Sequence, residues 1–254
     1  MTARRALALG ILLWAALLHP ATAAQLVLII DDIGDNLALG RRAADLPGAV
    51  ALAVLPHTPH GHYLAQRAHR HGKDILLHLP MSNHGGRDPG PGALNAAMDR
   101  AGFAATLAAG LDGVPHVRGV NNHMGSELTE LPRQMSWLMR ELQRRQLYFV
   151  DSRTTPHTAA ERQARLHGLP HLRRHVFLDH KRCPRHIAER FEMLVEHARQ
   201  TGLAVGIGHP YPETLALLER RLPGLMLRGV TLVSPSQLLT PPPPDCAPAQ
   251  WACL

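Results

Sequence analysis

Aromatic residues are scarce in this chain: Phe, Trp and Tyr together make up 4% of its 254 residues. Single-stranded nucleic acids are bound largely by stacking their bases on such rings, so the chain lacks the material for a stacking platform. It also has no zinc-finger spacing and no other nucleic-acid-binding signature. Nucleic acid is therefore not an expected partner.

Cysteine is scarce too, with three residues in the chain. Three cysteines do not make a disulfide framework, and their spacing matches no metal-binding motif. Cys246 and Cys253 are close enough in sequence to pair in an oxidising compartment, which would leave Cys183 over. The chain is nevertheless long enough to bury a substantial apolar core.

Long apolar runs are limited to the N-terminus. Arg4 and Arg5 precede an apolar stretch over residues 6–18, and the small residues of "ATA" at 21–23 suit a signal peptidase. The stretch is shorter than the roughly 20 residues that span a bilayer, so residues 1–23 are interpreted as a cleaved signal peptide rather than an anchor. We expect a secreted or periplasmic protein with no stable membrane span after cleavage.

Acidic residues are outnumbered, because 27 Lys and Arg face 20 Asp and Glu, for a formal net charge of +7 at pH 7. This surplus of positive charge favours anionic partners. An exported protein meets anionic cell-wall polymers and lipid headgroups more readily than it meets nucleic acid.

Short runs of Val, Ile, Leu and Ala predict buried strands near residues 26–30, 50–55, 75–79, 147–150, 175–179, 203–208 and 229–233. Segments with helical spacing lie between several of them, near 62–72, 96–111, 135–146 and 185–202. This alternation predicts an α/β fold with a parallel sheet, and the number of units favours a (β/α) barrel. We expect one domain over 25–239 and an extended, proline-rich tail over 240–254.

Polar residues follow the predicted strands, at the ends where parallel α/β barrels build their active sites. We therefore expect these side chains to converge on one rim: Asp31, Asp32, His78, His123, Asp151, Asp179, His180 and His209.

The adjacent carboxylates of Asp31 and Asp32 would repel each other at the end of an apolar strand, and one would stay protonated. A divalent cation removes that penalty. Neighbouring residues on a strand point to opposite faces, or diverge where the strand breaks, so one aspartate could bind a metal while the other faces a substrate. One aspartate with two histidines is a common set of ligands for catalytic zinc.

The segments "LVLIIDDIGDN", "LLHLPM", "GVNNHMGSELT", "FVDSRT" and "IGHP" together resemble the divergent polysaccharide deacetylase family, a distant branch of the NodB-like carbohydrate esterases. The resemblance covers most of the chain from about residue 25 to 239. It implies a distorted (β/α) barrel. It also implies a metal-dependent hydrolase, with zinc as the expected ion, that removes an acetyl group from an amino sugar of a cell-wall or related glycan.

Carried over residue by residue, the resemblance makes Asp31 the catalytic base, Asp32 a metal ligand and His209 the general acid. The ordinary NodB-like group takes both histidine ligands from one "HxxxH" type motif. The segment "LLHLPMSNHGG" has no such motif, because His78 and His84 are wrongly spaced. The nearest interpretation takes His78 from one strand and His123 from the next.

Other polar residues of the same segments are expected to support the site. Asn121, Asn122 and Ser126 could orient the ligands or substrate hydroxyls, and Asp151 with Arg153 could hold the base or acid in position. The scarcity of aromatic rings fits a small or charged substrate, or a narrow pocket, better than a long crystalline polysaccharide.

Two other functions remain open. A metal-free glycoside hydrolase could use Asp31 with Asp151 or Asp179 as its two carboxylates. A non-catalytic protein could bind a glycan or a protein partner through the same site, since the usual histidine motif is missing.

Structural roles remain open as well. Asp31 and Asp32 could cap a helix, and His78 could be a satisfied core histidine, whereas His123 lies among polar residues typical of a loop. Asp151 and Arg153 could form a structural ion pair, and His209 could simply end a strand before Pro210.

Overall fold

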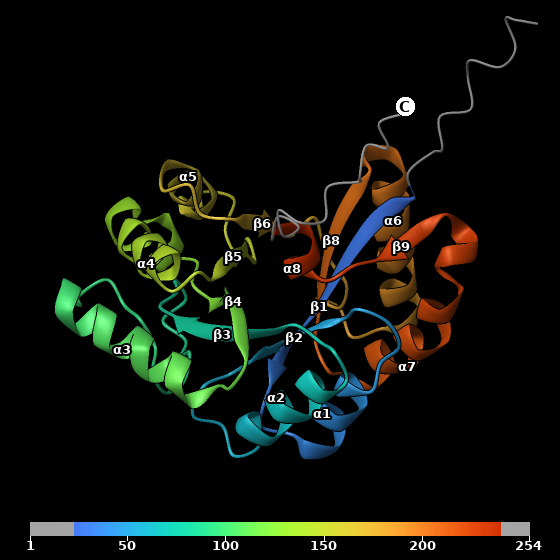
Figure 1. Ribbon diagram of the computed structural model, residues 1–254, viewed down its shortest axis with the longest axis horizontal. Helices are drawn as coiled ribbons and strands as arrows, with labels where there is room; N and C mark the ends of the chain where they lie inside the picture. Colours follow the sequence, from blue (N-terminus) through green and yellow to red (C-terminus); the bar gives the residue numbers. More distant parts are fainter. Residues whose placement is uncertain (1–22, 240–254) are drawn as a thin grey trace, which may run out of the picture.

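Nine strands form one curled sheet in the computed structural model, which describes residues 23–239 (Figure 1). Except for its last residue, the predicted signal peptide lies outside the described residues. So does the proline-rich tail with Cys246 and Cys253.

Every strand pairing in the sheet is parallel, in the order β6-β5-β4-β3-β2-β1-β8-β7, with β9 added beside the start of β1. The strands are β1 Ala24–Ile33, β2 Ala51–Val54, β3 Ile75–Met81, β4 Val117–Met124, β5 Tyr148–Asp151, β6 His171–Arg173, β7 Val176–Phe177, β8 Leu203–Gly208 and β9 Val230–Leu232. The sheet curls into a half-barrel with β6 and β7 at its two ends. The predicted distorted (β/α) barrel is thereby confirmed.

Helices cover the outer face of this sheet (Figure 1). They are α1 Leu37–Ala44, α2 Gly61–Arg70, α3 Arg100–Gly113, α4 Pro132–Arg144, α5 Ala160–Leu166, α6 Pro184–Thr201 and α7 Pro212–Arg221. The short α8 Pro235–Leu239 lies on the inner side instead. Local sequence sets their ends: Asp99 caps α3 by accepting from the Gly102 N–H at 2.8 Å, and α6 begins at a proline. None of the described helices is long and apolar enough to cross a membrane.

Two apolar layers follow from the alternation of side chains along the strands. One face of each strand packs against the outer helices, and β1 contributes Leu26, Leu28 and Ile30 to this larger layer. The other face fills the inside of the half-barrel, where β1 contributes Val27 and Ile29. The next inward-facing residues after the last apolar ones therefore lie together at the carboxyl ends of the strands, which we call the upper end of the half-barrel.

The lower end of the half-barrel, where the strands begin, is closed by α8. The Asp74 carboxylate accepts hydrogen bonds from the Ser236 backbone N–H and hydroxyl, both at 2.8 Å, and from the Tyr148 hydroxyl at 3.2 Å. Leu238 and Leu239 pack against the inner layer. With this end closed, the upper end is the one that leads to the polar residues.

The strand β4 differs from the sequence-based expectation, which treated the residues around His123 as a loop. Asn121 and Asn122 are buried within β4, where Asn121 lies opposite His78 and His123 lies opposite Pro80 of β3. Their amides are satisfied by partners on neighbouring strands, and those tertiary contacts override the low strand propensity of asparagine.

Close packing of β4 against β5 depends on Gly119. A Cβ atom at this position would collide with the ring of buried Tyr148. We expect Gly119→Ala to lower the free energy of unfolding by about 1–3 kcal/mol, as overpacking of a dense core does. Urea denaturation measures this change. Gly113→Ala is the control, because nothing lies within 4 Å of its added Cβ. Equal stability of the two variants would contradict this account of the β4–β5 contact.

Candidate active site

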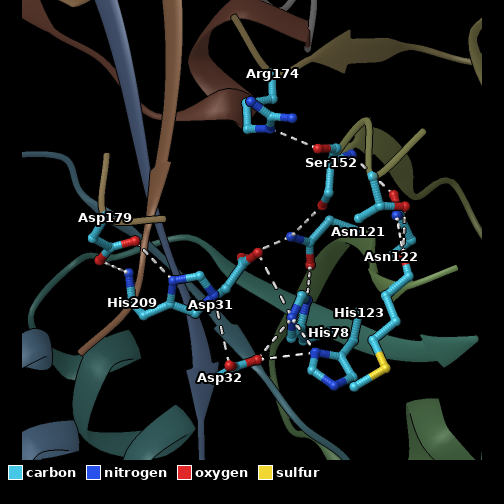
Figure 2. Close-up of polar contacts among 12 residues, drawn as sticks. Asp31, Asp32, His78, Asn121, Asn122, His123, Ser152, Arg174, Asp179 and His209 are labelled. Atoms are coloured by element: carbon cyan, nitrogen blue, oxygen red, sulfur yellow. Dashed lines mark hydrogen bonds and ion pairs between the residues drawn. The ribbon is translucent and has the colours of Figure 1, made fainter. Parts of the chain in front are cut away.

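The polar cluster at the upper end of the half-barrel continues the inner face of several strands (Figure 2). On β1 the inner residues Val27 and Ile29 are followed by Asp31, and on β8 Val205 and Ile207 are followed by His209. The same period of two brings further polar side chains into the cluster: His78, Asn121, His123 and Ser152.

A break in β1 brings both aspartates to the same place. The pairing of β1 with β2 changes register between Ile30 and Ile33, and Asp32 has a left-handed backbone with φ of 54°. The side chains therefore do not point to opposite faces as they would on a regular strand. Asp32 Oδ1 lies 3.1 Å from His78 Nε2, and Asp31 Oδ2 lies 3.6 Å from the same nitrogen.

Three potential metal ligands form a small triangle. Asp32 Oδ1 lies 3.0 Å from His123 Nδ1 and 3.1 Å from His78 Nε2, and the two nitrogens are 3.1 Å apart. Asp32 Oδ1 is buried without a hydrogen bond of acceptable geometry, although both imidazoles are within ion-pair distance. Atoms bound to one zinc ion at about 2.0–2.2 Å are separated by roughly 3 Å, so this donor set fits a divalent metal.

Asn121 connects this triangle to Asp31. Its side-chain oxygen accepts from His78 Nδ1 at 2.9 Å, and its side-chain nitrogen donates to Asp31 Oδ1 at 2.8 Å. The bond to Nδ1 leaves the Nε2 lone pair of His78 facing Asp32, which is the tautomer that a metal ligand needs.

Burial and the neighbouring charges shift the pKa values of Asp31 and Asp32 in opposite directions. Burial raises the pKa of Asp31 above its ordinary value, and the nearby His78 and His209 offset this effect only in part. Burial also acts to raise the pKa of Asp32, but its close contacts with the His123 and His78 imidazoles outweigh this effect and hold that pKa well below its usual range. Burial acts to lower the pKa of His78, but the two carboxylates raise it to about 9. The triangle is therefore suited to positive charge, whether a proton or a metal ion.

On the other side of Asp31, His209 is fixed by Asp179. The Asp179 carboxylate accepts from His209 Nδ1 at 2.9 Å and from the His209 backbone N–H at 2.7 Å. Thr214 donates a third hydrogen bond, at 2.7 Å. This arrangement directs His209 Nε2 toward Asp32 Oδ2, 3.6 Å away. The sequence placed Asp179 at the rim but assigned it no such role, although its position two residues after inward-facing Phe177 predicts it.

The residues that the sequence predicted to support the site are not all in contact with it. Asn122 accepts from the Ser152 N–H at 2.9 Å and so joins the ends of β4 and β5. Asp151, on the outer side of β5, accepts from the Arg153 backbone N–H and from Thr158, and does not hold Asp31 or His209. The Ser126 hydroxyl accepts from the His84 N–H at 3.2 Å, away from the triangle.

Two residues that the sequence did not single out complete the cluster. Ser152 follows Tyr148 and Val150 on the inner face of β5 and lies 3.4 Å from the Asn121 side-chain nitrogen. Arg174 donates to the backbone oxygen of Ser152 at 2.6 Å. Alternation along β5 would have identified Ser152, whereas no local signal marks Arg174.

A pocket of about 490 Å³ opens beside the cluster. Asp31, His78, His123 and His209 line one side of it, and Arg153 and neighbouring residues line another. A water and a small acyl group therefore have access to Asp31, His209 and the metal-binding triangle at once.

Comparisons with known proteins agree with this architecture. A family model described as divergent polysaccharide deacetylase matches residues 28–239. The chain is 35% identical over 242 residues to the uncharacterized protein YibQ of Escherichia coli K12, covering 95% of this chain and 75% of YibQ.

Among solved structures, the uncharacterized protein ATU2773 of Agrobacterium tumefaciens C58 is similar with a TM-score of 0.82 and 24% identity, covering 86% of this chain and 90% of that one. A family 4 carbohydrate esterase from Streptomyces lividans, solved with acetate, is similar with a TM-score of 0.50 and 13% identity, covering 85% and 96%. At these identities the structural similarity shows the fold alone.

The hydrogen bond between Asp179 and His209 predicts that the pKa of His209 depends on Asp179. Burial acts to lower the pKa of His209, but the hydrogen bond and charge of Asp179, with Asp31 and Asp32, raise it above its ordinary value. Asp179→Asn removes the charge that raises this pKa most and weakens the hydrogen bond, so we expect the pKa of His209 to fall. NMR titration of the imidazole in chelator-treated protein measures it. Thr214→Val, which keeps the Asp179 charge, should have a smaller effect, and an unchanged pKa in Asp179→Asn would refute the assignment.

Proposed function

This chain belongs to the divergent polysaccharide deacetylase family, and from this premise we propose that it is a metal-dependent hydrolase that removes an acetyl group from an amino sugar of an extracytoplasmic glycan. The observation that carries the proposal is the triangle of Asp32, His78 and His123, with Asp31 on one side and His209 on another.

The three triangle residues would hold a divalent ion, for which we propose zinc. When bound, the ion would supply Lewis acidity toward the acetyl carbonyl and acidify a water molecule. The buried Oδ1 of Asp32, which has no hydrogen bond of acceptable geometry, and the tautomer imposed on His78 by Asn121 both support this assignment.

Asp31 is placed to act as the general base. Its carboxylate faces the pocket and is held by Asn121, and its raised pKa brings proton affinity closer to what base catalysis near neutral pH requires. In the proposed reaction Asp31 takes a proton from the attacking water, whose oxygen forms the new bond to the acetyl carbon.

His209 is placed to act as the general acid. Its raised pKa favours the protonated form, and Asp179 directs Nε2 toward the site. When the C–N bond breaks, His209 donates its proton to the leaving nitrogen, so that the products are acetate and a free amino sugar. Asp179 is a positioning residue, because it acts through His209.

A metal-free glycoside hydrolase is less well supported by the positions of the carboxylates. Asp179 already accepts three hydrogen bonds, and Asp151 lies on the outer side of β5. Among the described residues that line the pocket, Asp31 is the one carboxylate, so no second carboxyl group faces it at the distance that such enzymes use.

Two substitutions at adjacent positions separate metal binding from catalysis. We expect Asp32→Ala to lose the bound metal, because a ligand of the triangle is removed. We expect Asp31→Asn to keep the metal but to lower kcat for acetylated amino-sugar oligomers by about 100-fold or more, since positioned bases contribute about that much. Elemental analysis of zinc-reconstituted protein and an acetate-release assay measure the two effects.

Each outcome has a distinct meaning. Undiminished zinc content in Asp32→Ala would refute the metal site, and full activity in Asp31→Asn would refute the base. Wild-type protein that binds zinc and acetylated glycans but releases no acetate would favour the glycan-binding alternative.

We also propose that the protein acts outside the cytoplasm, in the periplasm or in the medium. The support is the charged, apolar and small-residue order of residues 1–23, which is typical of a secretory signal peptide. Mass spectrometry of the protein recovered from the periplasmic fraction should show a chain that begins near Ala24. An intact N-terminus on cytoplasmic protein would contradict this proposal.

A further inference from the structure

Arginine residues gather in the pocket beside the polar cluster. Arg87, Arg153 and Arg174 line it, and no carboxylate among the described residues forms an ion pair with any of the three. The arginines outside the pocket are commonly paired, for example Arg67 with Asp45 and Arg228 with Glu192. Unpaired guanidinium groups in a pocket are available to bind an anionic ligand.

Arg174 holds the backbone of Ser152 and Arg153 in place, so only part of its guanidinium group is free to bind a ligand. Its Nε and Nη2 donate to the backbone oxygens of Ser152 and Arg153, at 2.6 and 2.8 Å, and its guanidinium carbon lies 5.0 Å from the Phe177 ring centroid. Burial, and then the charge of Arg153, lower the pKa of Arg174. Its charge still adds to the positive field of the pocket, because a guanidinium remains protonated.

Arg153 is the best-oriented of the three. Its backbone has a left-handed φ of 50°, its N–H donates to Asp151 at 2.8 Å and its carbonyl accepts from Arg174. The backbone is therefore fixed on both sides of the Cα atom, in a residue that lines the pocket. Asp151 thus contributes to the site by positioning Arg153 rather than the base or the acid.

Arg87 contributes a second guanidinium from the loop after β3. The loop is closed by Asn83, whose side chain accepts from the Arg87 N–H at 3.2 Å and donates to the Arg87 oxygen at 2.7 Å. The Arg87 side chain is exposed, so it can move to meet a ligand.

A second pocket that reaches the triangle has carboxylates in place of arginines. Its volume is about 330 Å³, and Asp32, Asp35 and Asp88 are among the residues that line it. A ligand with a negative group would therefore be favoured in the arginine-lined pocket over the aspartate-lined one.

We propose that the physiological substrate is an anionic glycan, in which the acetylated sugar or its neighbour carries a carboxylate or phosphate that Arg153 and Arg87 bind. This inference rests on the proposed function and specifies the substrate class of the same site. It also accounts for the scarcity of aromatic rings: Phe177 is the one Phe, Tyr or Trp among the described residues of this pocket, so charge takes the place of stacking in holding the sugar.

Three sugars that differ in charge test the proposal: N-acetylglucosamine, N-acetylmuramic acid and N-acetylglucosamine 6-phosphate. Their dissociation constants are measured by NMR titration of zinc-loaded protein. We expect at least one anionic sugar to bind about tenfold or more tighter than the neutral one, as charge-assisted hydrogen bonds imply. The identity of that sugar distinguishes a carboxylate from a phosphate.

Four variants locate the effect. Arg153→Gln should abolish the preference for the anion, Arg153→Lys should restore part of it, and Arg87→Gln should reduce it. Arg140→Gln is the matched control, because Arg140 is an exposed arginine of α4 outside the pocket, and it should keep the full preference. A preference that survives in Arg153→Gln, or equal binding of all three sugars, would overturn the proposal.

Acetate release from oligomers of the same sugars separates this inference from the function on which it rests. Equal turnover of neutral and anionic oligomers would overturn the anionic substrate and leave the deacetylase standing. Anion binding that depends on Arg153, with no acetate released from any sugar, would support the ligand class and refute the hydrolase.

Discussion

The structure around the site depends on placing two carboxylates, those of Asp31 and Asp32, at the buried end of one strand. Both lie within 3.6 Å of His78 Nε2, in surroundings that water screens little. Such a pair is tolerated only if positive charge lies beside it. His78 and His209, whose pKa values are raised, provide that charge from two other strands, and a divalent ion in the triangle would provide more.

A parallel sheet is well suited to collecting these partners. The β-ladder sets His78 of β3 opposite Asn121 of β4, and His123 follows two residues later on the same face. The usual "HxxxH" type motif obtains both histidines from one segment, whereas here two neighbouring strands supply one each. The fixed register of the two strands replaces the local spacing of the motif, and Asn121 of β4 connects His78 to Asp31 through its side-chain amide.

The sequence predicted much of this because strand ends are visible as apolar runs that stop at polar residues. Asp31, Asp32 and His209 end such runs, and His78 interrupts one. β4 was harder to recognise, since its inner residues are asparagine and histidine, which become strand-like only when their side chains have partners on other strands. Asp151 was expected to hold the base or the acid, but it faces the outer side of β5 and its neighbour Ser152 faces the cluster. The sequence draws attention to the charged residue of such a pair, although adjacent residues face opposite sides. Arg174 bonds to backbone oxygens of a distant segment, and such a contact has no signature in sequence.

The distribution of charged residues around the site bears most directly on its specificity. The triangle of Asp32, His78 and His123 adjoins both an arginine-lined pocket and an aspartate-lined one. Hydrogen bonds to Asp151 and Arg174 both fix the backbone of Arg153. A left-handed backbone is strained for a residue other than glycine, so the use of two charged residues to hold Arg153 in this conformation needs an explanation. The proposed anionic ligand provides one, because a fixed Arg153 presents its charge at a constant position in the pocket that Asp31 and His209 also line.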